Sequence, residues 1–155
     1  MKKSIELLKT KLENKLKGKV RSFYVGDPWI IAESLMPAIM ISPDRTETNV
    51  LDNQRDEHNH YVDVSLIIDA RQFFDATPDK MVGTIFLMDI MEAEMSDGTI
   101  DPASILGILR DNLNLGTNRH IENISSIDYT VRRRTEELIT LEVVAHLQIK
   151  YLITR

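Results

Sequence analysis

The chain contains no cysteine, which excludes a disulfide framework and thiolate chemistry and fits a reducing compartment. It also has no apolar run approaching the roughly 20 residues that a helix needs to cross a bilayer. Apolar residues near the N-terminus are separated by lysines, whereas a signal peptide requires a contiguous apolar stretch. These absences favour a protein that folds in the cytoplasm and does not contact a membrane.

The motifs of several enzyme classes are missing as well. There is no glycine-rich phosphate loop, no nucleophile elbow and no His-Glu-x-x-His pattern. Asp44 and Lys150 faintly suggest the core of a metal-dependent nuclease, but Gln148 stands where the second carboxylate is needed. His58 and His60 would share a strand face, yet no third ligand has a supporting spacing. We therefore expect no catalytic residue, no metal and no cofactor.

The net charge of −5 is distributed unevenly along the 155 residues. Residues 1–21 carry eight basic and two acidic side chains, a balance of +6, which leaves −11 for the remainder. A basic start is compatible with nucleic-acid or anionic membrane contact, or simply with a solvated helix face. The acidic bulk argues against tight duplex binding, because phosphate affinity requires a concentrated positive surface. We favour the solvated helix face.

The strongest periodic pattern lies at 138–153. Every odd-numbered residue from 139 to 153 is apolar, and most of the residues between them are polar. This period of two predicts a long strand with its odd-numbered face in the core. Residues 127–131 alternate in the same way, and the polar stretch 132–137 separates the two runs. The pattern predicts a hairpin with a charged tip.

Upstream, the pattern predicts a helix, further strands and two more helices. Residues 4–17 carry one apolar stripe at helical spacing, with Ser4 as the expected N-cap and Gly18 as the stop. The pattern does not decide the secondary structure of the short apolar run 29–32. Strands are predicted at 20–25, 37–43 and 61–69, and helices at 78–95 and from 101 to about 115, before Gly116. Because strands and helices segregate, the fold class is α+β: one domain with a mostly antiparallel sheet of about four to five strands and a long C-terminal hairpin, packed against helices.

The helix predicted at 78–95 is apolar on two sides. One stripe runs from Met81 to Met95, and a second, nearly opposite, comprises Val82, Phe86 and Ile90. A helix of this kind must be covered on both sides, by the sheet on one and by a neighbouring helix or another subunit on the other. We take Val82, Phe86 and Ile90 as a candidate subunit interface, with intramolecular packing of both stripes as the alternative.

The most polar part of the chain is 44–60. A structureless loop of this length is uncommon in a compact domain and is often functional or disordered. Two alternatives remain open, a projecting hairpin and a segment that becomes ordered only against a partner. The candidate docking residues in this stretch are its charged side chains Arg45, Glu47, Asp52, Arg55 and Asp56.

With these elements in place, the layout resembles the tail terminator proteins of long-tailed phages, the family that includes the lambda minor tail protein U. The resemblance is carried by an N-terminal amphipathic helix followed by 20–25, a proline-led strand at 37–41, the polar excursion that returns at 61–68, and helices preceding a final long strand. It implies a six-subunit ring in the virion, at the head-proximal end of the tail. The ring would contact the tail tube protein and the head-completion or connector protein, with DNA only passing through. The family supplies no catalytic residue.

Arg132, Arg133 and Arg134 are a second candidate contact between subunits. Three adjacent cations at a hairpin tip repel one another, and an acidic surface of the next subunit would relieve this repulsion. A solvated turn is the simpler alternative. A different class of function also stays open: a small-molecule or partner-binding α+β domain, enzymatic or not, with 44–60 as a lid. A closed ring in solution would favour the first function, and a monomer with a deep pocket the second.

Overall fold

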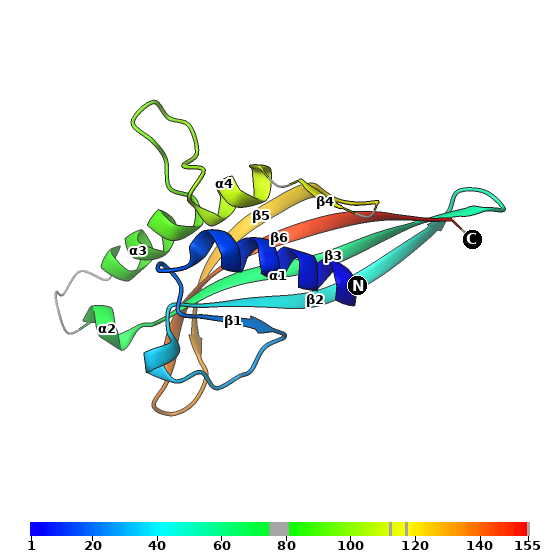
Figure 1. Ribbon diagram of the computed structural model, residues 1–155. Helices are drawn as coiled ribbons and strands as arrows, with labels where there is room; N and C mark the ends of the chain where they lie inside the picture. Colours follow the sequence, from blue (N-terminus) through cyan, green and yellow to red (C-terminus); the bar gives the residue numbers. More distant parts are fainter. Residues whose placement is uncertain (75–80, 112, 117, 155) are drawn as a thin grey trace.

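The computed structural model describes residues 1–74, 81–111, 113–116 and 118–154 (Figure 1). Its six strands form one sheet in the order β1-β2-β3-β6-β5-β4. The strands are β1 Ser22–Val25, β2 Ala38–Val50, β3 Arg55–Asp69, β4 Asn114–Gly116, β5 Arg119–Arg133 and β6 Ile139–Thr154. The helices are α1 Lys2–Leu16, α2 Arg71–Phe74, α3 Met81–Met91 and α4 Ile105–Asp111, with a 3₁₀ turn, η1, at Glu33–Leu35. The predicted α+β class is confirmed, with one or two more strands than expected.

The sheet is antiparallel except at one edge, where β1 runs parallel to β2. The last strand, β6, lies between β3 and β5 and pairs with both along most of its length. The prediction for its odd-numbered face is confirmed in the middle of the strand and fails at the ends, where Ile139 and Tyr151 are partly exposed. The buried positions are Leu141, Val143, Ala145, Leu147 and Ile149.

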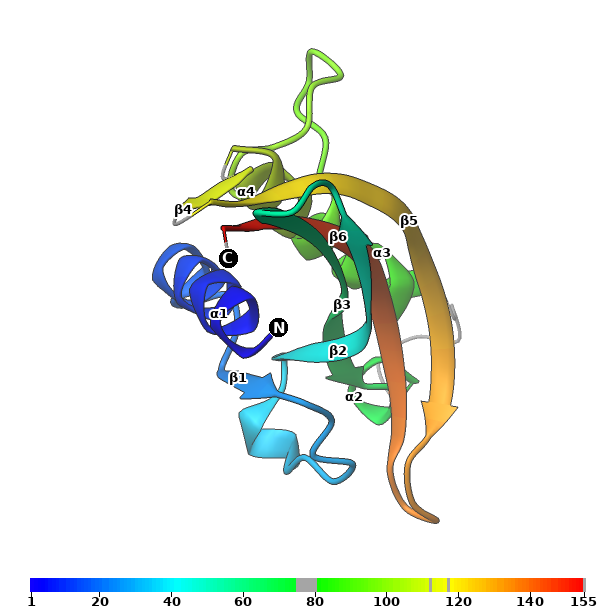
Figure 2. The ribbon, with the colours of Figure 1, turned by 90° about the vertical axis from the view of Figure 1, so that its right-hand side faces the viewer.

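The main core lies between the sheet and α1, α3 and α4. The predicted stripe of α1 is confirmed, because Ile5, Leu8, Leu12 and Leu16 are all buried against the sheet. Figure 2 shows the sheet curving so that α1 lies inside its bend. Ser4 does not cap this helix as expected; it lies inside α1, is buried, and its Oγ is 3.1 Å from His60 Nδ1 on β3. The helix starts earlier, at Lys2, so Ser4 falls in its first turn.

Of the two alternatives for the polar stretch 44–60, a projecting hairpin or a segment ordered only by a partner, the structure shows the hairpin. The strand predicted at 37–43 continues to Val50, and the chain turns at 51–54 and returns as β3. The return strand also pairs with β6 as far as Arg55 opposite Thr154. Polar side chains do not prevent strand pairing, because the ladder is built from main-chain groups while the side chains stay solvated.

The two predicted helices are shorter than the sequence suggests. The predicted start of the first helix, at residue 78, lies outside the described residues, and α3 ends at Met91 rather than Met95. After it, residues 92–101, which we call the arm, fold back on themselves with Met95 N donating to Thr99 O at 2.7 Å. The chain also continues past α4 as β4, in which Leu115 is buried, while Leu113 is exposed instead of lining a helix face.

Gly107 allows α4 to sit close to the preceding turn. A Cβ at this position would lie 2.2 Å from the carbonyl oxygen of Asp101, so any larger residue would displace the turn or the helix. Every helix in the described ranges is too short or too polar to cross a membrane.

Candidate functional site

The helices leave one face of the sheet without a helical layer. On this open face, side chains of β2, β3, β6 and β5 and the loop at Asp27 line a groove of about 390 Å³. Charged residues dominate it, among them Asp63, Arg132, Glu142 and His146. At the end of the open face near β1 a small second core forms; its members are Ile31, Met36, Ala38, Met40, Ile67 and Leu138.

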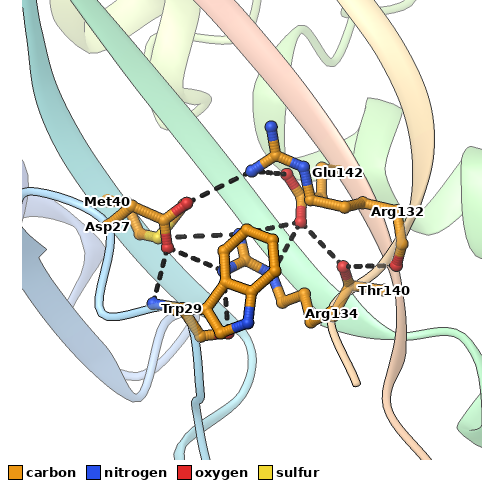
Figure 3. Close-up of polar contacts among 7 residues, drawn as sticks. All are labelled: Asp27, Trp29, Met40, Arg132, Arg134, Thr140 and Glu142. Carbon is orange, nitrogen blue, oxygen red and sulfur yellow. Dashed lines mark hydrogen bonds and ion pairs between the residues drawn. The ribbon is translucent and has the colours of Figure 1, made fainter. Parts of the chain in front are cut away.

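A buried ion-pair network closes one end of the groove (Figure 3). The side chain of Arg134 is fully buried; its Nε donates to Glu142 Oε1 at 2.9 Å and its Nη1 to Asp27 Oδ1 at 2.7 Å. The same Nη1 donates to the carbonyl oxygen of Trp29 at 3.1 Å. Thr140 Oγ1 donates to Glu142 Oε1 at 2.7 Å. The arginine therefore fastens the 27–29 loop to the middle of the sheet.

Asp27 is the exposed end of this network. Partial burial alone would raise the pKa of its carboxyl, but hydrogen bonds from Arg134 and from the Trp29 amide, with the charges of Arg134 and Arg132, hold that pKa below its ordinary value. The carboxylate is thus ionised, as the pairing with two guanidinium groups requires. Arg132 Nη1 lies 3.2 Å from Asp27 Oδ2 and 3.9 Å from Glu142 Oε2.

The network corrects the expectation that three arginines stand together at a solvated tip. Arg134 is buried and its charge is neutralised inside the subunit, so it does not await a neighbour. Arg132 is about half exposed but also paired within the chain. Arg133 is exposed and donates to the carbonyl oxygens of Thr135 and Glu136. Successive residues of β5 point to opposite faces, which separates Arg133 from the other two.

Further along the open face, two side chains of β6, His146 and Lys150, each lie between carboxylates of the flanking strands. His146 Nδ1 is 2.6 Å from Asp63 on β3, and its Nε2 is 3.0 Å from Asp128 on β5. Lys150 Nζ is 3.3 Å from Glu57 on β3 and 3.6 Å from Glu122 on β5. The open face therefore carries two rows across three strands, in each of which a basic side chain of β6 lies between two carboxylates.

These contacts limit the chemistry that the groove supports. Both ring nitrogens of His146 face carboxylates, so neither is directed at a hydroxyl that it could activate as a base. The faint nuclease pair does not come together either, because Asp44 pairs with Arg45 at 2.8 Å while Lys150 binds Glu57 and Glu122. Within the described ranges, no group of three or more His, Asp or Glu side chains could hold a metal ion.

The structure contradicts the predicted subunit interface on α3, because Phe86 and Ile90 lie on the side of the helix that packs against the core. Ile90 is buried in the main core and Phe86 packs against it, whereas Ile85 and Met88 of the other stripe are 49% and 42% exposed. The side chain of Val82 lies outside the described residues. Leu87 is buried on the same side of the helix as Ile90. Of the stripe expected in the core, Met91 at the end of the helix is fully buried, while Ile85 and Met88 are not.

The candidate docking residues of 44–60 fall in two groups. Arg45 Nε donates to Glu47 at 3.1 Å on β2, and its guanidinium lies 3.9 Å from the centre of the Tyr61 ring. Asp52 pairs with Arg55 at 2.7 Å in the turn at the tip of the hairpin. Asp56 follows in β3 with a half-exposed side chain. The structure therefore brings Arg45 and Glu47 together and keeps the tip pair apart from them.

Sequence reasoning did not single out Asp27, Glu142 or His146. For Glu142 and His146 a signal was present, because both occupy the polar side of the alternating pattern in the final strand. Asp27 gave no signal beyond its place in a Gly-Asp-Pro turn.

Two long strands also expose a main-chain edge. β1 covers β2 only as far as Ile41, and β4 covers β5 only at its first residues. In the described chain no strand pairs with the outer edge of β2 beyond Ile41 or of β5 beyond Ile121. Each edge presents unpaired main-chain N–H and C=O groups that another strand can complete.

No protein-family model matches the chain, and no curated protein sequence matches it significantly.

Proposed function

We propose that the protein is a structural subunit of a phage tail, one of six copies in a ring that caps the tail tube and joins it to the head connector. The observation that carries this proposal is the pair of free edges on β2 and β5. A single long sheet with one open edge on each side fits a head-to-tail contact, in which the β5 edge of one copy adds to the β2 edge of the next.

The strand directions are compatible with such a contact. β2, β3, β6 and β5 alternate in direction, so β5 of one copy runs antiparallel to β2 of its neighbour. The unpaired parts of the two edges are offset along the strand direction. Asp128, in the middle of the unpaired part of β5, stands opposite Val144, which stands opposite Ser65, which stands opposite Met40 on β2. The unpaired part of β2, however, starts only beyond Ile41. Pairing them requires a stagger, and a staggered, tilted register is what closes a sheet into a barrel.

The charges of the open face suit a channel for DNA. In the ring, we place the open face of each subunit toward the lumen, so that the helical layer, which lies inside the bend of each sheet (Figure 2), faces outward. There, Lys150 and Arg132 are already bound by carboxylates, and His146 lies between Asp63 and Asp128. Cations held in this way bind phosphate weakly, and an acidic lumen lets the DNA pass.

The alternative of a ligand-binding domain with 44–60 as a lid has less support. These residues are built into β2, β3 and the turn between them, and their main-chain groups pair with the sheet. A lid requires a segment that can open without breaking such a ladder.

The proposal is tested first on the purified chain by mass photometry and light scattering, and then on isolated tail tubes by electron microscopy. We expect rings, in solution or at one end of each tube, and tubes that no longer elongate. Since the chain has no cysteine, Glu47→Cys on β2 and Thr130→Cys on β5 give a specific probe. The double variant should cross-link into a ladder of species that ends in a closed ring. Wild-type protein that stays monomeric at tube ends overturns the proposal.

A further inference from the structure

On the helix side of the sheet, which is the side opposite the open face, β5 is only partly covered. Helix α3 packs on β3 and β6 through buried side chains such as Leu87 and Ile90. Along β5 the side chains on the same side become more exposed toward the end of the strand: Ile127 is partly buried, Tyr129 is 37% exposed and Val131 is 63% exposed. We call these three residues the β5 ledge.

A groove of about 140 Å³ lies between α3 and the β5 ledge. Its lining includes Thr84 and Leu87 of the helix and Tyr129 and Val131 of the strand. The hydroxyl of Tyr129 donates to the carboxylate of Glu92, directly after the helix. Burial and this carboxylate raise the pKa of Tyr129, so its hydroxyl stays protonated and keeps the bond at neutral pH. The bond fixes the ring of Tyr129 beside the helix in the free subunit.

The groove opens on the main-chain edge of β5. In the described chain no strand pairs with this edge beyond Ile121, so the ledge lies next to main-chain groups that an added strand can complete. A strand added there would place every second side chain over the ledge and the others on the open face. The groove is therefore suited to an extended segment that carries β-branched or apolar side chains at alternate positions.

The unpaired part of β2 has this alternation. Thr46 stands opposite His60, which stands opposite Ile149 of the main core, so Thr46 faces the helix side. Thr48 and Val50 follow on the same side. All three are exposed, and Val50 is 67% exposed. The residues between them and before them, which face the open side, are polar: Arg45, Glu47 and Asn49.

We propose that β2 of a second copy of the chain lies along β5 with Thr46, Thr48 and Val50 over the β5 ledge, beside α3. This inference rests on the proposed ring and adds a contact between side chains to the contact between main-chain edges. On both strands the helix side carries β-branched, apolar or aromatic side chains and the open side carries polar ones. One antiparallel register therefore matches both sides at once. Pairs of aromatic and β-branched side chains at opposite positions stabilise neighbouring strands.

The register follows from the antiparallel direction of the two strands. When Glu47 of the neighbour stands opposite Thr130, three pairs stand opposite each other over the ledge. They are Thr46 with Val131, Thr48 with Tyr129, and Val50 with Ile127. The contact covers the exposed valine of each edge, Val50 and Val131.

Val131→Glu and Val50→Glu test the contact in the full chain. Each places a carboxylate where the neighbour would bury it, whereas both side chains are exposed in the free subunit, so folding should persist. Each variant should associate at least about tenfold more weakly than wild type in mass photometry and sedimentation, or on tail tube ends if the free chain is monomeric. Circular dichroism verifies folding.

The matched control is Leu35→Glu. Leu35 is an exposed apolar residue of η1, and its main chain accepts a hydrogen bond from Ser22, at the part of the β2 edge that β1 covers. The control introduces the same charge outside the groove and the unpaired edges, so it should associate like wild type.

Cysteine pairs test the register, because the chain has no cysteine of its own. Thr46→Cys with Val131→Cys places two thiols opposite each other on the helix side and should cross-link neighbours under mild oxidation. Within one subunit, β3 and β6 separate β2 from β5, so this disulfide can form only between subunits. Asn49→Cys with Val131→Cys places the thiols on opposite sides of the sheet and should not cross-link.

The groove contact and the ring fail in different ways. Undiminished association of Val131→Glu or Val50→Glu overturns the groove contact and leaves the ring. Cross-linking of the Glu47 and Thr130 pair without cross-linking of the Thr46 and Val131 pair has the same meaning. A wild-type chain that stays monomeric even at tube ends overturns the ring and the groove contact together.

Discussion

Arg134 and Glu142 lie face to face across the turn between β5 and β6, with Arg134 Nε 2.9 Å from Glu142 Oε1 and both side chains almost completely buried. The pair joins the last hairpin to the loop at Asp27, which is more than 100 residues away in the sequence. An ion pair of this kind is costly to break, because either partner alone would remain charged in a site without water.

Arg134→Met is therefore expected to destabilise the fold by about 3 kcal/mol or more. The double variant with Glu142→Leu should recover much of this loss, since it leaves no unpaired charge in the pair. Equilibrium unfolding in urea measures both changes. Arg133→Met is the control on the exposed neighbour and should lie within about 0.5 kcal/mol of wild type. Equal losses in the single and double variants would contradict the assignment.

His60 should make stability depend on pH. Burial beneath α1 and nearby positive charges lower the pKa of His60 to about 4. Between pH 6.5 and 4 the unfolded chain binds a proton that the folded chain does not, so stability falls as the pH falls through this range, by up to about 3 kcal/mol. Thermal unfolding should show this slope in wild type and in the control His120→Gln, and a flatter one in His60→Gln. Identical slopes in the two variants would refute it.

The orientation of α3 predicts different outcomes for substitutions on its two sides. Ile90→Glu buries an unpaired carboxylate and should cost several kcal/mol, enough to prevent soluble folding. Ile85→Glu and Met88→Glu fall on the exposed side and should change the free energy of unfolding by no more than about 0.5 kcal/mol. Soluble yield and circular dichroism distinguish them. Loss of folding in Ile85→Glu with normal folding in Ile90→Glu would restore the orientation expected from sequence.

A carboxylate at position 146 should be poorly tolerated, although the residue lies on the open face. His146→Asp would place three carboxylates on adjacent strands, together with Asp63 and Asp128. We expect a loss of stability at neutral pH that shrinks in high salt and at pH 4, where carboxylates begin to protonate. His146→Gln adds no charge and serves as the control. Equal urea midpoints of the two variants at low salt would show that the carboxylates of Asp63 and Asp128 do not repel a charge at position 146.

The parts of the fold that follow from local pattern could be predicted, and those that depend on distant partners could not. Period two placed the buried face of β6, and helical spacing placed the stripe of α1. The polar hairpin at 44–60 stayed ambiguous because its side chains are solvated and its order comes from main-chain pairing with β6. The strand order, with β6 between β3 and β5, has no local signature at all.

The candidate site was predictable only in part for the same reason. Arginines in a row suggested repulsion, yet Arg134 finds Asp27 and Glu142 through contacts that no spacing in the sequence reveals. For α3, two apolar stripes gave no criterion for which one faces the sheet. Packing against the sheet decides it: Leu87, Ile90 and Met91 are buried in the main core, and those contacts join the helix to residues far away in the sequence.

The central place of β6 also sets the order of events during synthesis. Until residues 139–154 leave the ribosome, β3 and β5 have no strand between them, and the main-chain groups of β3 that pair with β6 have no partner. The native sheet cannot grow steadily from its N-terminal edge, because its second half is added around the last strand. Such long-range pairing is slow, because the chain loses the entropy of loop closure before the new contacts stabilise it. Without β6, the edge of β3 is open to pairing with another chain, as any unpaired strand edge is.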